Sequence, residues 1–315
     1  MARFGRTVAL AGLVAVAHLG CGEQDRAGGG PGGAGAGAKV IGVTLLSQSQ
    51  DFFKDLEAGL REEAKKHGYR LIVQAAEFDP STQRRQLEDF VTQKVDAVVV
   101  SPADSDTVAP SLVAVTAAKI PIFTADIAAR GAEVVSHVAS DNAQGGRLAG
   151  EAMARYLGGK GKVLVVDHPT VSSVQDRVRG FEDALKAFPG IAIVARPSGD
   201  GQRAKAQAVT EDALTAHADL AGIFGINDDS ALGALRAVEA AGRGGIVIIG
   251  YDATPEAQAA IRRGSALKAD VVQFPRKIGA ATIATIARYF AGEKVPRLQP
   301  VEVGLVDLTS LGGSK

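Results

Sequence analysis

Short apolar runs alternate with helical segments along most of this chain, and that alternation constrains its fold more than any other feature. Several runs, such as residues 163–166 and 246–249, are continuously apolar, which is typical of strands buried on both faces of a parallel sheet. The β-rich runs lie at residues 40–46, 71–74, 97–100, 120–124, 134–135, 163–166, 191–194, 222–224, 246–249 and 267–272.

The segments between these runs have helical spacing and marked ends. Apolar residues step by three or four through positions 171, 174, 178, 181, 185 and 188. Thr254 followed by Pro255 provides an N-cap and a proline at the first helical position, and Gly264 closes that segment. Asp228 or Asp229 can cap the helix that runs to Ala241. Sustained alternation predicts an α/β fold with parallel sheets covered by helices on both faces, and the length suits two such units.

The first 38 residues have the composition of an export signal followed by a tether. Arg3 and Arg6 precede an apolar run at residues 8–17, which is too short to span a bilayer as a helix. Cys21, the only cysteine of the chain, follows this run and is itself followed by Gly- and Ala-rich sequence. We therefore predict a signal peptide at 1–20 and a flexible tether at 21–38, which places the rest of the chain in the periplasm or otherwise outside the cytoplasm.

A lone cysteine directly after a signal peptide is similar to the lipid-acceptor cysteine of bacterial lipoproteins. This resemblance predicts a lipid anchor at Cys21 that holds the protein at a membrane. His18 departs from the pattern, because lipoprotein signals usually have an aliphatic residue three positions before the cysteine. Ordinary cleavage without lipidation is the alternative.

Charge and residue counts argue against several classes of function. Lys+Arg and Asp+Glu are both 35 and no long basic run occurs, so nucleic acid is not expected as a partner. The five histidines have no paired metal spacing, and one cysteine cannot build a thiolate site, so neither metal nor cofactor is expected.

We also expect no enzymatic activity. The glycine-rich residues 158–162 precede a strand instead of joining a strand to a helix, so they are not a phosphate loop. The sequence has no G-x-S-x-G elbow. Asp167 and His168, followed by Ser172 and Ser173, leave a hydrolase as a weak alternative.

Polar side chains follow several of the apolar runs, where the carboxyl ends of parallel strands open onto a cleft. They include Asp126, Asn227, Asp252 and Gln273, and Gln50 follows the first strand. Carboxylates and amides suit sugar hydroxyls, each of which is both a donor and an acceptor. Such residues also act as turn formers and helix caps, which is the alternative role for each of them.

Two phenylalanines follow the first strand and suit the other part of a sugar. The C–H faces of a sugar ring pack on aromatic rings, which Phe52 and Phe53 would supply. Adjacent residues point in different directions, so at least one of the two is expected to belong to the core.

At these residues the chain resembles the ribose-binding, sugar-clamping group of periplasmic binding proteins that serve ABC transporters. The resemblance runs from about residue 40 to 306 and is carried by residues 51–59, 101–106, 134–142 with 145–146, 227–235 and 250–255. It implies two Rossmann-like lobes, joined by three crossovers, that close over a sugar (the type I periplasmic binding protein fold). The resemblance gives ligand contacts at Gln50, Phe52, Phe53, Asp126, Gln175, Asn227, Asp252 and Gln273.

Several positions depart from the pattern of the ribose binders. Gln50 stands in place of asparagine, Ile127 in place of one arginine and Gln175 in place of another, and Gly201 in place of an aromatic residue. These departures predict a cleft without two guanidinium groups, and therefore a ligand other than ribose. Ser172 and Gln175 also fit a capping box, which would give Gln175 a structural role instead.

The combined interpretation is a monomeric solute receptor for a monosaccharide or polyol that docks on the membrane subunits of an ABC importer. The expected lobes are residues 39–140 with 274–302, and 141–273 with 303–311. A sensor lipoprotein that presents a sugar, an autoinducer or a nucleoside to a receptor is the main alternative. A regulator of the lactose-repressor type would need an N-terminal helix-turn-helix, where this chain has a signal and a tether instead.

Overall fold

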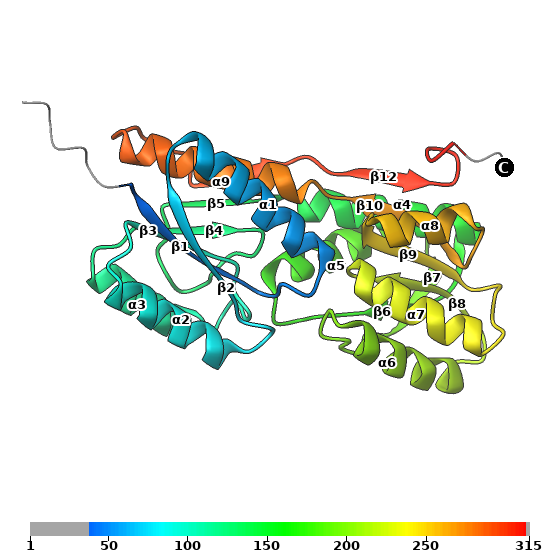
Figure 1. The fold of residues 1–315 in the computed structure, drawn as a ribbon. Coiled ribbons are helices and arrows are strands. Elements are labelled where there is room, and N and C mark those ends of the chain that lie inside the picture. Colours follow the sequence, from blue (N-terminus) through cyan, green and yellow to red (C-terminus); the bar gives the residue numbers. More distant parts are fainter. Residues whose placement is uncertain (1–37, 313–315) are drawn as a thin grey trace, which may run out of the picture. The chain divides into compact units, whose positions relative to one another are not determined.

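The computed structural model describes residues 38–312, so the predicted signal peptide, the anchor at Cys21 and almost all of the tether lie outside the described residues. Within the described part, two six-stranded sheets carry helices on both faces. This arrangement confirms the predicted α/β fold with two lobes (Figure 1).

The first lobe has the strand order β11-β5-β4-β3-β1-β2, and every neighbouring pair is parallel. Helices α1 and α9 pack together, as do α2 and α3. Ile41, Val43 and Leu45 of β1 are fully buried, as expected for a central strand. The elements are β1 (Val40–Leu45), α1 (Asp51–Lys66), β2 (Arg70–Ala75), α2 (Pro80–Thr92), β3 (Ala97–Val100), α3 (Ala109–Ala117), β4 (Ile122–Ala125), β5 (Ser136–Ser140), α9 (Pro275–Phe290) and β11 (Leu298–Val301).

The second lobe has the order β12-β10-β9-β8-β6-β7, in which only β12 runs antiparallel, with Val271 of β10 opposite Leu305. Helices α4 and α5 pack together, and α6 packs on α7. The elements are α4 (Asn142–Leu157), β6 (Lys160–Val166), α5 (Ser172–Leu185), β7 (Gly190–Ala195), α6 (Arg203–Ala216), β8 (Leu220–Gly225), α7 (Asp228–Ala240), β9 (Val247–Asp252), α8 (Pro255–Arg262), β10 (Leu267–Val272) and β12 (Gly304–Asp307).

The chain crosses between the lobes three times: after β5, after β10 and between β11 and β12. The end of the chain therefore adds one edge strand to each sheet. No helix among residues 38–312 has the length and apolar character needed to cross a membrane.

Three local details differ from the pattern in the sequence. The run at 134–135 ends just before β5, which begins at Ser136 and whose buried polar residues hide it from a search for apolar runs. The short strands β11 and β12 were not predicted, because β11 contains Pro300 and neither strand is fully buried. Asn227, not an aspartate, caps α7, and its side chain accepts a hydrogen bond from Ser230 N.

Candidate ligand-binding cavity

A cavity with about 400 Å³ of empty space, its opening included, lies between the two lobes. It is lined by residues that follow the carboxyl ends of β1, β4, β6, β8 and β10, by the last residue of β9, and by the first turns of α1 and α5. Sheets that wind helices on both faces bind ligands at this edge.

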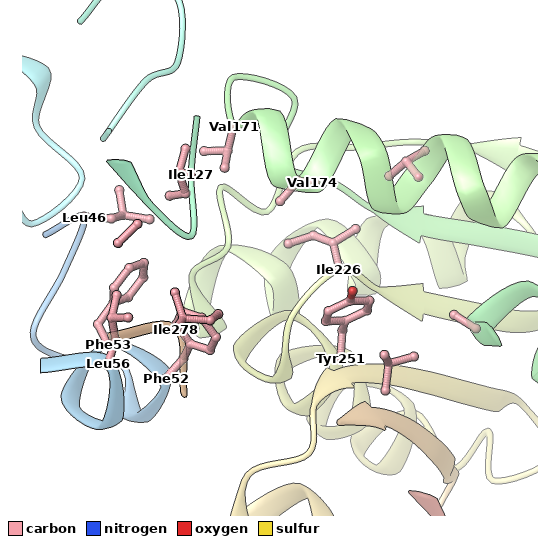
Figure 2. Close-up of a cluster of buried hydrophobic side chains, with 14 of the residues drawn as sticks. Leu46, Phe52, Phe53, Leu56, Ile127, Val171, Val174, Ile226, Tyr251 and Ile278 are labelled. Carbon is pink, nitrogen blue, oxygen red and sulfur yellow. The ribbon is translucent and has the colours of Figure 1, made fainter. Parts of the chain in front are cut away.

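The apolar part of the wall joins both lobes. Figure 2 shows Phe52 and Phe53 on the side of α1, facing Val171, Val174 and Ile226 of the second lobe. The two phenylalanine rings meet edge to face, with centroids 5.2 Å apart. Both rings line the cavity and both also belong to the buried core. The two residues that were predicted to stack on a sugar are thus supported by core packing on the side away from the cavity.

Asp126 and Asp252 both reach the cavity from strained backbone. Asp126 follows β4 with φ of 67°, and Asp252 ends β9 with φ of 122°. Residues other than glycine rarely adopt positive φ, at a cost of about 1–3 kcal/mol each, and such strain concentrates at functional sites. The structure therefore brings together the two aspartates predicted from the strand ends and holds each in a costly conformation.

The Asp126 carboxylate is buried, and its Oδ1 has no hydrogen-bond partner among residues 38–312. Burial raises the pKa of this carboxyl group to about 6, and the charge of Arg177 opposes the rise. A buried acceptor without a donor is unfavourable, so a ligand hydroxyl that donates to Oδ1 would relieve the desolvation.

Asp252 is half-buried and belongs to a network with two buried acids and one buried amide. Its Oδ1 accepts from Gln273 Nε2 at 2.6 Å, and its Oδ2 accepts from Asp228 N at 3.3 Å. The carboxylates of Asp228 and Asp270 lie beneath it and accept from the backbone N–H groups of Thr254 and Ala253. Burial, and then the charge of Asp228, raise the pKa of Asp252. The network fixes the orientation of Asp252 and leaves Gln273 Oε1 without a partner within the described part of the chain.

The amides of Gln50 and Asn227 meet at the same carbonyl of the second lobe. Gln50 Nε2 donates to Gly201 O at 2.8 Å and to Asp229 Oδ2 at 2.9 Å. Asn227 Nδ2 donates to Gly201 O at 3.0 Å. Both residues line the cavity, and Asn227 also has the capping role that turn statistics favoured.

Gln175 is the one proposed contact that the structure places away from the cavity. Its Nε2 donates to Pro169 O at 2.6 Å, and its Oε1 accepts from Arg130 of the first lobe. The capping box does not form either, since Val171 is the N-cap of α5 and no side-chain bond caps that end. Gln175 thus joins the lobes beside the cavity.

The expectation that the cleft lacks two guanidinium groups is wrong in part, because Arg177 lines the cavity and is 4% exposed. His168 limits the space beside Gly201, the position where the ribose binders have an aromatic residue. A Cβ built on Gly201 would lie 3.2 Å from His168 Nδ1. Ile127 lines the cavity with an apolar surface, as the sequence implied. Arg177 could have been found from its position three residues after Val174, on the cavity face of α5.

The remaining polar residues of interest have structural partners. The Asp167 carboxylate accepts from the backbone N–H of His168 and from Arg196, instead of from the imidazole, so the hydrolase constellation is not assembled. Asp141 caps α4 by accepting from Gln144 N at 2.9 Å. Among residues 38–312 no group of three or more metal-ligating side chains could hold an ion.

Comparison with known proteins places this geometry among solute receptors. A family model described as a periplasmic binding protein domain matches residues 41–294. The chain is 35% identical to the ribose import binding protein of Escherichia coli K12 over 268 residues. The alignment covers 85% of this chain and 90% of that protein.

Two solved structures share the fold. A solute-binding protein from Mycobacterium smegmatis with bound glycerol is 33% identical, with a TM-score of 0.83 over 88% of this chain and 96% of that one. A periplasmic solute-binding protein from Actinobacillus succinogenes 130z with bound D-allose is 30% identical, with a TM-score of 0.80 over 87% of this chain and 99% of that one.

Proposed function

This chain belongs to the periplasmic binding protein domain family, and from that premise we propose that it is the extracytoplasmic solute-binding component of an ABC sugar importer. It binds a monosaccharide or polyol in the cavity between its lobes. Members of this family bind solutes for transport, which agrees with the expectation of a binding protein instead of an enzyme.

The observation that carries this proposal is a pair of unpartnered oxygens in a cavity with an aromatic wall. Asp126 Oδ1 and Gln273 Oε1 are buried beside the cavity, and neither has a partner within residues 38–312. Both atoms accept hydrogen bonds, and a polyhydroxylated ligand has donors for them. Phe52 and Phe53 supply the apolar surface that the C–H face of such a ligand needs.

Closure over the ligand is supported by hydrogen bonds that join the lobes directly. Ser105 N donates to Thr170 O at 3.0 Å, and Ser172 N donates to Ser105 Oγ at 2.9 Å. The Ser172 hydroxyl accepts from Ala128 N at 3.0 Å. A ligand that contacts both lobes adds to these bonds and so shifts the population toward the closed form. We assign residues 39–140 with 274–302, and 141–273 with 303–311, to the two moving lobes.

The ligand is neutral, because the charges around the cavity disfavour an anion. Asp126 and Asp252 line the cavity against the single cation Arg177. The adjoining rim carries further acids, and its Arg203 is already paired with Asp229 at 2.9 Å and with a second acid. Sugar phosphates and uronic acids would meet uncompensated carboxylates there.

Placement in the cell follows from the segments that precede residue 39. We propose that the signal at 1–20 exports the chain, that Cys21 bears the lipid anchor, and that the monomeric closed form docks on the importer's membrane subunits. Ribose itself would bind weakly, because Ile127 leaves one hydroxyl of a ribose without a partner, at roughly 1–3 kcal/mol.

The test is a calorimetric and thermal-shift panel of D-ribose, D-allose, xylitol, myo-inositol and glycerol, with D-galacturonate as an anionic control. We expect at least one neutral compound to bind with a micromolar or tighter Kd and to raise the Tm, because it binds the native state alone. Asp126→Ala should weaken that ligand at least about tenfold, since it removes a buried acceptor. Asp89→Ala, an exposed change on α2, should not. A panel in which no neutral sugar or polyol binds would contradict the proposal.

A further inference from the structure

A second space adjoins the ligand cavity. It has about 480 Å³ of empty volume, its opening included. The polar residues of its wall are Asp104, Thr170, Asp200, Gln202 and Lys205. Among residues 38–312, Phe78 and His168 are the two that line both this space and the ligand cavity. These two side chains therefore form the partition between the two spaces.

The partition is built from both lobes. Phe78 lies between β2 and α2 of the first lobe, and His168 follows β6 of the second lobe. The centroids of their rings are 6.5 Å apart and the ring planes are tilted by 45°, which is within the range of aromatic contacts. Because the rings come from different lobes, the partition exists only while the lobes are closed.

The backbone presents Phe78 in a costly conformation. Glu77 and Phe78 both have positive φ, 48° and 65°, which residues other than glycine rarely adopt. The Phe78 N–H donates to Leu46 O at 3.0 Å, and the Glu77 carboxylate accepts from Gln48 N at 2.8 Å, so the turn is held in place. Asparagine or glycine would adopt this backbone at lower cost. The turn itself does not require a phenyl ring, and strain of this kind concentrates at functional sites.

The opposing ring is an uncharged imidazole. His168 is 8% exposed, and burial lowers its pKa below the usual value of 6.5, so the ring is neutral at pH 7. A neutral ring packs against a phenyl group without the cost of burying a charge. Gly201 leaves room for it, because a side chain there would meet the imidazole.

We propose that Phe78 and His168 form a gate across the cleft, which shuts the ligand cavity off from the adjoining polar space when the lobes close. The inference rests on the proposed function and deepens it, because the gate limits the length of the ligand. A single sugar ring or a short polyol ends at the gate and lets the two rings meet. A ligand with a further polar unit at that end, such as a second sugar, would hold the rings apart and oppose closure.

The experiment removes one ring at a time and measures the binding of enlarged ligands by calorimetry. The probes are whichever of D-ribose, D-allose, xylitol, myo-inositol and glycerol binds the wild type most tightly, and its mono-O-(2-hydroxyethyl) ethers. We expect the wild type to bind every ether at least about 30-fold more weakly than the parent. Phe78→Asn tolerates the positive φ and should bind one ether at least about tenfold more tightly than the wild type does, because its added chain enters the polar space.

Three further variants separate the gate from other effects. Lys94→Asn relieves similar backbone strain, with φ of 52°, at an exposed position away from both spaces, so it should reject the ethers as the wild type does. Phe78→Tyr keeps a ring and should also reject them. His168→Ala opens the gate from the second lobe and should accept the same ether as Phe78→Asn. It also provides the test if Phe78→Asn does not fold.

The outcomes distinguish the gate from the proposed function itself. Folded Phe78→Asn and His168→Ala proteins that bind the parent and still reject every ether would overturn the gate. A wild type that binds the parent and its ethers equally well would overturn it too. A wild type that binds none of the parent probes would instead refute the proposed function.

Discussion

Replacing Asp126 by asparagine should make the ligand-free protein more stable near neutral pH while weakening its binding of ligand. The Asp126 carboxylate is buried, lacks a partner on Oδ1 within residues 38–312, and has a pKa raised from 3.8 to about 6. In the unfolded chain the same group ionises in water. Folding therefore removes a charged group from water with only the charge of Arg177 as compensation.

The sign and size follow from linkage. The pKa of Asp126 is higher in the folded state than in the unfolded chain. The contribution of the protonated Asp126 carboxyl group to stability is therefore fully present below pH 3.8 and is lost as pH rises through about 6. The shift of about two pKa units corresponds to roughly 3 kcal/mol at most. Asparagine cannot ionise, so Asp126→Asn should match the wild type near pH 4 and exceed its stability by roughly 1–3 kcal/mol at pH 7.5.

Urea denaturation of the ligand-free protein at pH 4.5, 6 and 7.5 measures this difference, with Asp89→Asn on the exposed face of α2 as control. Calorimetry with the tightest neutral ligand should show affinity lower by about tenfold or more, because a charged acceptor is replaced by a neutral amide. A stability difference between Asp126→Asn and wild type that does not change with pH would refute the reasoning. So would a variant less stable than wild type at pH 7.5.

Three further outcomes are expected. Ser172→Ala removes the hydroxyl that bonds to Ala128 of the first lobe. Although this hydroxyl does not contact the ligand, its loss should weaken ligand binding about 3- to 10-fold in calorimetry. Unchanged affinity would show that the bond does not contribute to closure. Gly146→Ala would place a Cβ 1.9 Å from Arg177 O and should lower the free energy of unfolding by about 1–3 kcal/mol, whereas Gly244→Ala meets nothing within 4 Å and should change little; equal effects would contradict the packing argument. Cys21→Ser should release the protein from the membrane, and fractionation with acyl labelling decides it, since a wild type that is already soluble and unlipidated ends the anchor hypothesis.

The strand ends were predictable because their signal is local. An apolar run followed by an aspartate or an amide indicates both the strand and its carboxyl end, where the cleft lies. This pattern predicted Asp126, Asn227, Asp252 and Gln273. Arg177 was not predicted to line the cavity, because this depends on which face of α5 meets the cavity. The family resemblance drew attention instead to Gln175, two residues earlier.

The support behind the site could not be predicted, because it depends on close contacts between distant segments. Gly145 and Gly146 let Tyr251 and α5 approach α4, where any side chain on these glycines would collide with Tyr251 Oη or Arg177 O. Tyr251 in turn stacks beneath the guanidinium of Arg177. In the sequence the two glycines contribute to the family resemblance, but nothing in their pattern indicates which distant residues they contact.

The two edge strands β11 and β12 have a consequence for the timing of folding. Because β11 completes the sheet of the first lobe and β12 that of the second, neither lobe is finished until residues 298–307 have been made. At about 5–20 residues per second, a 315-residue chain spends roughly 15–60 s on the ribosome. For that time the lobes lack their last strands. The pairing that completes the first lobe sets Leu298 opposite His137, a long sequence separation that favours slow folding, whereas β12 pairs with the nearby β10. The nascent chain thus remains open to factors that bind extended polypeptide for nearly the whole of its synthesis.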